Sequence, residues 1–184
     1  MQFATNHLGH FTLALGLHDA LKQAGHARVV VVSSVGHING DVQFDDVSFE
    51  RHPCDPWKAY AQSKTANVMF IIEAAWRWKD DGITVNAVNP GRIGTTKLGR
   101  FAAPPPASFE PNSKDVSYKS IEQGAATSVL LAGSPLVEGI TGTYFEDCQP
   151  ALLHKPGVAK RRRELRARPG ARASPVAAVT GIDP

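Results

Sequence analysis

Residues 27–33 carry the run that decides the fold class: Ala27-Arg28-Val29-Val30-Val31-Val32-Ser33. Apolar and polar residues do not alternate along it, as they would in a strand with one face in water. An unbroken β-branched run of this length predicts a strand that is covered on both faces, as in a parallel sheet. Residues 83–89 predict a second strand, which Pro90 and Gly91 stop.

The segments around the two runs have helical periodicity. Residues 3–24 carry two adjacent rows of apolar side chains at helical spacing, which predicts a helix covering a sheet, with a polar interruption at residues 6–10. Residues 56–79 predict a second, longer helix that Gly82 ends. The order helix, strand, helix, strand with short links predicts a parallel α/β sheet with a right-handed crossover.

The sequence after the second strand predicts one more helix and one more strand. Ser120 and Gln123 form a capping box that opens a helix reaching about residue 132, and residues 141–145 predict a short third strand. Residues 97–118 are rich in proline and small polar residues. They predict a long irregular loop, of the kind that often shapes a binding site.

Composition favours one soluble globular domain over residues 1–150, followed by a different segment. The chain has 184 residues, 42% hydrophobic and 20% charged, with no apolar run long enough to span a membrane. Residues 155–184 hold eight Lys and Arg against two acidic residues, so the net charge of +3 comes from the tail. We expect residues 151–184 to be a disordered basic tail, and without interleaved aromatic residues we expect no nucleic-acid binding.

The cysteines and the N-terminus indicate a cytoplasmic protein. Cys54 and Cys148 match no metal-ligand spacing and suit a reducing compartment, with a single disulfide as the alternative. The first residues lack the basic and apolar regions of a secretory signal. We therefore expect no metal site and no export.

Polar residues follow both predicted strands. Ser33 and Ser34 come after the first strand, and Pro90 and Gly91 come after the second. The carboxyl ends of parallel strands meet at one edge of a sheet, where open α/β folds bind their ligands. Taken alone, Ser34 has an alternative role, which is to satisfy backbone groups at a strand end.

Tyr60 and Lys64 lie four residues apart on the predicted helix and therefore share one of its faces. A cation beside a phenol favours the phenolate and lowers the phenol pKa, which would make Tyr60 a general acid or base. The alternative is an ordinary solvated helix face. Asn6 likewise could be a surface residue of the first helix, with its side chain satisfied by water.

Four separated features occur in a fixed order: Asn6-x-x-Gly9, Ser33-Ser34, Tyr60-x-x-x-Lys64 and Asn89-Pro90-Gly91-x-Ile93-x-Thr95. In this order and at these intervals, residues 1–150 resemble the short-chain dehydrogenases/reductases. The long interval between Ser34 and Tyr60, the segment 6–11 and the ending 144–148 are similar to the retinol-dehydrogenase-like subgroup.

The resemblance implies NAD(P)-dependent interconversion of an alcohol and a carbonyl. Tyr60 would be the acid/base, and Ser34 would hydrogen-bond the reacting oxygen. Lys64 would lower the Tyr60 pKa and bind the nicotinamide ribose, while Asn6 would hold a water of the proton relay. Tyr60 and Lys64 would thus also contact the cofactor, whose nicotinamide would be lined by Pro90, Gly91, Ile93 and Thr95.

The resemblance covers only the later part of the family's fold. Members of the family begin with a strand and a glycine-rich turn that binds the cofactor pyrophosphate, and this sequence contains no such turn. The implied fold class is α/β, the C-terminal part of a Rossmann-like doubly wound parallel sheet with about three strands and the first four strands missing. The choice between NAD and NADP is not readable, because its determinants belong to the missing part.

The missing strands lead to three expectations. The strand at 27–33 would expose an apolar edge, the chain would be poorly stable or aggregate, and it would bind the cofactor weakly or not at all. We therefore expect the isolated chain to be largely inactive. A longer natural protein in which Met1 is internal is one interpretation of the sequence, and a genuine short form is the other.

Two functions remain open. The set of Asn6, Ser34, Tyr60 and Lys64 favours an oxidoreductase acting on a small alcohol or carbonyl, which Phe101 and Phe109 in the loop at 97–118 indicate to be apolar. The missing phosphate-binding part favours a catalytically silent remnant that acts as an oligomerisation or interaction module, through a homo-oligomer formed by the long helix.

Overall fold

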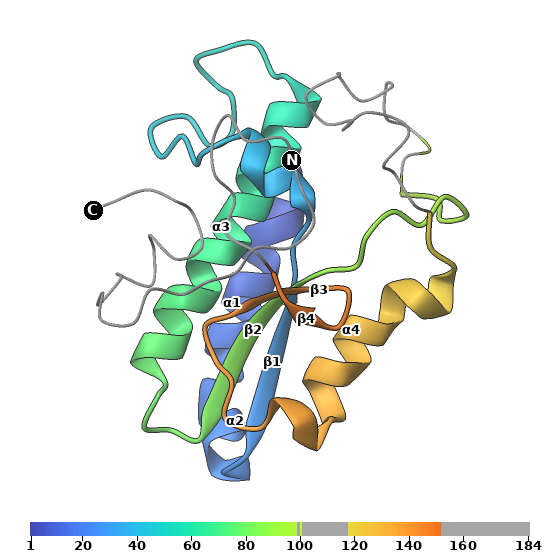
Figure 1. Ribbon diagram of the computed structural model, residues 1–184. Helices are drawn as coiled ribbons and strands as arrows, with labels where there is room; N and C mark the ends of the chain where they lie inside the picture. The colour runs from blue at the N-terminus through green and yellow to red at the C-terminus, as the bar shows by residue number, and fades with distance from the viewer. Residues whose placement is uncertain (99, 101–117, 152–184) are drawn as a thin grey trace, which may run out of the picture.

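The computed structural model describes residues 1–98, 100 and 118–151. Most of the predicted loop at 97–118, with Phe101 and Phe109, lies outside the described residues, as does the predicted tail beyond residue 151. The described residues form one sheet in the order β1-β2-β3-β4 with helices on both sides (Figure 1). The α/β class predicted from the sequence is therefore confirmed.

Three strands of the sheet are parallel and end at a common edge. Strand β1 (Ala27–Val32) pairs with β2 (Ile83–Asn89), and β2 pairs with β3 (Tyr144–Glu146). A two-residue strand that the sequence did not predict, β4 (Gln149–Pro150), runs antiparallel to β3. Val32 lies opposite Val88, so the residues that follow β1 and β2 leave the sheet side by side.

Strand β3 is shorter than the predicted strand at 141–145. The residues before it are held partly by side chains rather than by a regular ladder. The Thr141 hydroxyl accepts from the Val85 backbone N–H at 2.9 Å, and the Asn86 side chain bonds both Ile140 and Thr143. These bonds hold residues 140–143 beside β2, and the β3 ladder begins only after them.

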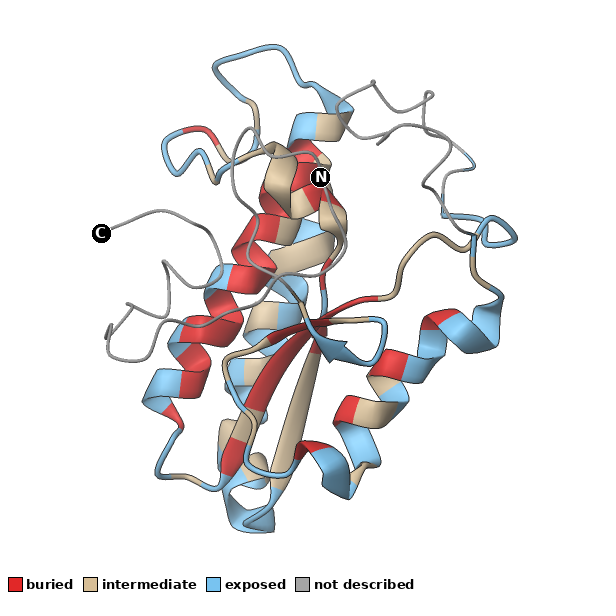
Figure 2. Cartoon of the chain, viewed as in Figure 1, coloured by how far each residue is buried: buried red, intermediate tan, exposed pale blue. Residues whose placement is uncertain are grey.

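Helix α3 (Pro56–Arg77) is the longest element and carries much of the core. Asp55 caps its start by accepting from the Trp57 and Lys58 backbone N–H groups, and Pro56 occupies its first turn. The helix ends two residues before the predicted Lys79, because buried Trp78 turns the chain back onto the core. Buried residues occur along its length (Figure 2), and those in its C-terminal part face the sheet.

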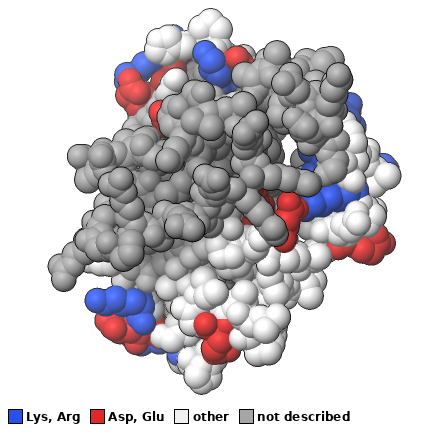
Figure 3. All heavy atoms as spheres, viewed as in Figure 1, with Lys and Arg blue, Asp and Glu red and all other residues white. Residues whose placement is uncertain are grey.

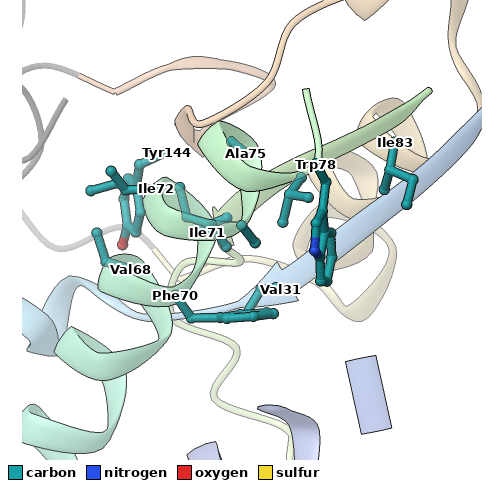
Figure 4. Close-up of a cluster of buried hydrophobic side chains, with 12 residues drawn as sticks. Val31, Val68, Phe70, Ile71, Ile72, Ala75, Trp78, Ile83 and Tyr144 are labelled. Carbon is teal, nitrogen blue, oxygen red and sulfur yellow. The ribbon is translucent and has the colours of Figure 1, made fainter. Parts of the chain in front are cut away.

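Each face of the sheet has its own core. Between α3 and the sheet lie side chains from the helix and the residue after it and from β1, β2 and β3 (Figure 4): among them Val31, Val68, Phe70, Ile71, Ile72, Ala75, Trp78, Ile83 and Tyr144. On the other face, helix α4 (Ile121–Gly133) and the short 3-10 helix η4 (Pro135–Val137) pack Leu131 and Val137 against Val88 and Phe145. The α4 capping box of Ser120 and Gln123 is confirmed.

The single helix predicted over 3–24 is wrong. The segment consists of a π-helical turn η1 (Ala4–Leu8), α1 (Gly9–Gly16) and α2 (His18–Ala24), with a break at Leu17. Only part of the predicted apolar face meets the core, through Phe11, Ala14 and Leu21, while Leu8, Leu15 and Leu17 are exposed. In the π-helical turn η1, Asn6 makes hydrogen bonds with Ser63 and Asn67 of α3.

Strand β1 has a free edge. Among residues 1–98, 100 and 118–151 it pairs with β2 alone, and it lies at the end of the sheet order. Its last residue, Val32, is 49% exposed. An open apolar edge of this kind is a template for pairing with another chain.

The exposed edge of β1 predicts marginal stability and self-association. We expect the 184-residue chain to melt below about 45 °C, the lower end of the usual range for such domains. Light scattering should rise with protein concentration, since the edge can pair between copies. Thermal unfolding and static light scattering over a concentration series measure both. A cooperative, concentration-independent transition above that temperature would contradict the prediction.

Candidate active site

The candidate site is built around the carboxyl end of β1. The Ser33 N–H donates to the Val88 carbonyl at 2.8 Å, which extends the pairing with β2 by one residue. The buried Ser33 hydroxyl donates to the Lys64 carbonyl at 2.9 Å. The end of the strand is thereby fixed to α3, and Ser34 emerges beside that helix.

Ser34 has extended backbone and caps a short 3-10 helix, η2 (Val35–Asn39), by accepting from the Gly36 N–H at 3.1 Å. This cap is the backbone role that the sequence left open as an alternative for Ser34. The same hydroxyl also faces the Tyr60 phenol and lowers the pKa of that phenol. Ser34 and Tyr60, separate in the sequence, therefore meet at the end of β1.

The electrostatics of Tyr60 differ from the prediction. Burial raises the pKa of the Tyr60 phenol above its ordinary value, and the Ser34 hydroxyl acts in the opposite direction. The predicted lowering by Lys64 is wrong for this structure. The Lys64 Nζ lies 5.7 Å from the centre of the Tyr60 ring and donates instead to the Val32 carbonyl at 3.1 Å. For Lys64, burial has the opposite effect and lowers the pKa of the ammonium below its ordinary value.

Asn6 lies in the π-helical turn η1, next to α3. Its side-chain Nδ2 donates to the hydroxyl of Ser63, the residue before Lys64, at 3.2 Å. Its backbone carbonyl accepts from Asn67 at 3.1 Å and is 3.2 Å from the His10 Nδ1. Single π-helical turns occur often at functional sites. The structure thus places Asn6, Ser34, Tyr60 and Lys64 around one strand end.

Two residues that the sequence analysis missed extend this group. The Tyr144 phenol is buried, and its hydroxyl has no hydrogen-bond partner among the described residues. Burial, followed by the charges of Glu146 and Tyr60, raises the Tyr144 pKa. The His37 ring packs on the Tyr144 ring at 4.9 Å, with its Nδ1 2.7 Å from the Ser34 carbonyl. An apolar strand pattern gives no sign of such a contact.

The segment after Ser34 is fastened to α3 by residues adjacent to the Tyr60–Lys64 pair. The Thr65 hydroxyl is 2.9 Å from the His37 carbonyl and 2.6 Å from the Gly40 carbonyl. Buried Gln62 donates to the Val47 carbonyl at 2.9 Å. The side of α3 next to the reactive pair therefore holds the loop that leads from Ser34 to the helix.

The predicted cofactor residues after β2 lie at the same edge of the sheet. Pro90, Gly91 and Ile93 are half-buried and Thr95 is exposed. Gly91 has a left-handed φ of 83°, and a Cβ there would lie 2.9 Å from the Lys119 side chain. The left-handed backbone is what favours glycine here, since the Lys119 atoms near it belong to the end of a flexible side chain.

Lys119 holds the turn at Gly91 in place. Its backbone N–H donates to the Arg92 carbonyl at 2.8 Å, and its ammonium pairs with Asp147 at 2.5 Å. The Asn89 side chain accepts from the Gly91 N–H at 3.1 Å. The turn after β2 is therefore preformed at the edge of the sheet that also holds Ser34.

A separate apolar groove of about 670 Å³ lies between α3 and the segment of η1 and α1. Its walls include Phe3, Phe11, Met69 and Trp78, with Phe44 from the loop before α3. Ser34, Tyr60 and Lys64 do not line it. The groove is therefore distinct from the candidate active site.

Metal-binding and membrane-spanning features are absent from the described residues. No three or more His, Cys, Asp or Glu side chains are grouped to hold a metal ion within those residues. Cys54 and Cys148 are both free, so the disulfide alternative is not realised. Within the same described ranges, none of the helices has the length and apolarity needed to cross a bilayer.

The comparisons with known proteins identify the family of the chain. The family model for short chain dehydrogenases matches residues 1–104. A probable oxidoreductase of Streptomyces antibioticus is 54% identical over 82% of this chain and 52% of its own length. Human retinol dehydrogenase 14 is 43% identical over 83% of this chain and 46% of its own length. The chain thus spans about half the length of these relatives.

A solved structure shows the same fold. The TT0495 protein from Thermus thermophilus matches with a TM-score of 0.59 and 23% identity, over 78% of this chain and 56% of the solved one. A likeness at that identity concerns the fold alone. The family model and the two relatives carry the conclusion: the chain belongs to the short-chain dehydrogenase/reductase family and is similar to retinol dehydrogenases and related oxidoreductases.

Proposed function

We propose that the site interconverts an alcohol and a carbonyl with NAD or NADP as the redox partner. The observation that carries this proposal is the gathering of Asn6, Ser34, Tyr60 and Lys64 around the end of β1. The turn at Pro90 and Gly91 lies at the same sheet edge. Family membership supports an oxidoreductase.

Tyr60 is the acid/base of the proposed reaction. In alcohol oxidation, the phenolate takes the hydroxyl proton while the carbon gives up a hydride; in reduction, the phenol returns the proton to the carbonyl oxygen. Ser34, whose hydroxyl already faces the phenol, donates to the reacting oxygen and stabilises the charge that develops there. Lys64 and Asn6 support proton exchange behind Tyr60.

A nicotinamide, when bound, supplies the hydride chemistry. The residues present fit its nicotinamide end, because the turn at Pro90–Gly91 is preformed and partly exposed beside the Ser34 edge. Pro90, Gly91, Ile93 and Thr95 would line the ring, and Tyr60 and Lys64 would face the adjoining ribose. For the pyrophosphate the sequence offers no glycine-rich turn, so we propose that this chain alone binds the cofactor weakly.

The proposed substrate is a small, apolar alcohol or carbonyl compound, and we propose a cytoplasmic location. Nucleic acid is not a proposed partner. On the face shown in Figure 3, the described Lys and Arg side chains lie near Asp and Glu rather than in a block of one sign. Lys22 pairs with Asp81, and Arg77 pairs with Glu73.

A second candidate function is an interaction module. The apolar groove between α3 and α1, together with exposed Phe44 and Trp76 near it, gives a surface for association with another copy through the long helix. This function needs no turnover. It becomes the better explanation if the chain binds no cofactor and transfers no hydride.

Cofactor binding by the 184-residue chain should be weak. NADH and NADPH fluorescence should show no saturable change at micromolar concentrations, with binding only in the range of about 1 mM, equivalent to about −4 kcal/mol. The reason is that no preformed phosphate turn contributes to binding. Saturation at micromolar cofactor would contradict this expectation and would mean that other residues hold the pyrophosphate.

Tyr60→Phe should remove alcohol oxidation. With NAD⁺ or NADP⁺ at saturating concentration, we expect the wild-type chain to oxidise simple alcohols slowly, at a rate that rises with pH because the phenolate is the base. Loss of the phenol should lower the rate by a factor of about 10² or more. Tyr118→Phe is the matched control, since the Tyr118 side chain is exposed, and it should keep the wild-type rate. A wild-type rate no higher than that of Tyr60→Phe would contradict the catalytic proposal and favour the interaction module.

A further inference from the structure

Asn67 is a buried polar residue of α3 that neither the sequence motifs nor the proposed chemistry uses. It follows Lys64 by three residues, so the two side chains project from the same side of the helix. The Asn67 side chain is 1% exposed. A helix position facing a core is ordinarily apolar, and a buried amide is tolerated only when its hydrogen bonds are made.

Every polar group of the Asn67 amide has a partner. Its Nδ2 donates to the Asn6 carbonyl at 3.1 Å and to the Val32 carbonyl at 3.2 Å. Its Oδ1 is 2.9 Å from the Nδ1 of His7. Two backbone carbonyls can only accept, so the amide nitrogen must face them and the oxygen must face His7. The His7 ring then carries its proton on Nδ1.

These contacts join Asn67 to the reactive lysine. The Val32 carbonyl that accepts from Asn67 also accepts from the Lys64 ammonium, at 3.1 Å. The Asn6 carbonyl belongs to the π-helical turn η1. The Asn67 side chain thus binds both the end of strand β1 and the turn that carries Asn6. The β1 atom that it binds, the Val32 carbonyl oxygen, is also the acceptor for Lys64.

We propose that Asn67 is a positioning residue for the reaction: it holds the Val32 and Asn6 carbonyls in register with Lys64 and so sets where the ammonium lies beside Tyr60. This inference rests on the proposed function for its catalytic consequence, but its geometric content concerns Lys64 alone. A residue that served only packing would contribute to stability and leave kcat unchanged in a variant that folds.

The test replaces Asn67 by Asp in the full 184-residue chain. Asp has the same shape, but it puts a carboxylate oxygen where the amide nitrogen faced two carbonyls, one of which accepts from Lys64. An anion close to an ammonium raises the ammonium pKa by about one unit or more. Asn86→Asp is the matched control. Asn86 lies in β2 and is also a buried amide: it donates to the Ile140 carbonyl and accepts from the Thr143 N–H.

The readout is the pH titration of the Lys64 side chain by NMR on ¹³C-lysine-labelled protein, with the signal assigned by its loss in Lys64→Arg. The other titratable groups of this network are Tyr60, His7 and His10, whose titrations are followed in the same samples. We expect the Lys64 pKa to rise by about one unit in Asn67→Asp and to stay unchanged in Asn86→Asp. An unchanged Lys64 pKa in Asn67→Asp, or equal shifts in both variants, overturns the proposal.

A measurement on the wild-type chain covers the case in which Asn67→Asp does not fold. Nitrogen-15 NMR of the His7 ring should show the neutral ring protonated at Nδ1. A ring protonated at Nε2 would remove the Asn67–His7 contact and with it the proposed orientation of the amide.

Activity separates this inference from the proposed function. With saturating cofactor, Asn67→Asp should lower kcat about tenfold or more with KM little changed, because Lys64 is misplaced, whereas Asn86→Asp should keep kcat. If the wild-type chain transfers no hydride, the proposed function fails, and the Lys64 titration alone then decides whether Asn67 positions the lysine.

Discussion

The burial of one side of α3 against β1 and β2 fixes the positions of the two reactive side chains that the helix carries. Ile71 and Val68 have no exposed surface, and each such side chain contributes about 1.5–3 kcal/mol on leaving water. With that side of the helix held by the core, Tyr60 and Lys64 can project only toward the end of β1. The hydrogen bonds that Ser33 and Lys64 donate then fix the position of α3 along the direction of β1.

The same burial determines the electrostatics. Both Tyr60 and Lys64 lose water, and loss of water favours the neutral form of each group, so the Tyr60 pKa rises and the Lys64 pKa falls. An ammonium 5.7 Å from the ring centre does not reverse this for Tyr60. The Ser34 hydroxyl is the group that favours the phenolate. In this structure the serine therefore has the role that the sequence assigned to the lysine.

The free edge of β1 and the site are linked through one atom. The Val32 carbonyl lies at the end of the strand that lacks a second partner among the described residues, and it accepts from both Lys64 and Asn67. Lys64 and Asn67 of α3 thus provide hydrogen bonds to a backbone carbonyl at the edge, and that carbonyl in turn orients the two side chains. A shift of the β1 edge would move the Val32 carbonyl, which is the acceptor for Lys64. The stability of the sheet is thereby coupled to the chemistry of the site.

Local patterns predicted the regular elements, and long-range contacts decided the rest. The strand at 27–33, the helix at 56–79 and the capping box at Ser120 each depend on neighbours in the sequence, and each element was confirmed, with the helix ending at Arg77. The break of the first helix, the ring that packs on Tyr144 and the network of Asn67 depend on residues that are distant in the sequence. The pKa of Tyr60 depends on how deeply α3 is buried, which no spacing of Tyr and Lys can show.

The Ser34 hydroxyl favours the phenolate of Tyr60 at the end of β1, and the most direct test of this central claim is titration of the tyrosines by NMR. The chain has three tyrosines, so ¹³Cζ signals can be assigned with Tyr118→Phe and Tyr144→Phe. We predict that Tyr60 titrates above the ordinary value of about 10, and that Ser34→Ala raises its pKa further because the phenolate loses a donor. A Tyr60 signal with an ordinary pKa that does not respond to Ser34→Ala would contradict the claim.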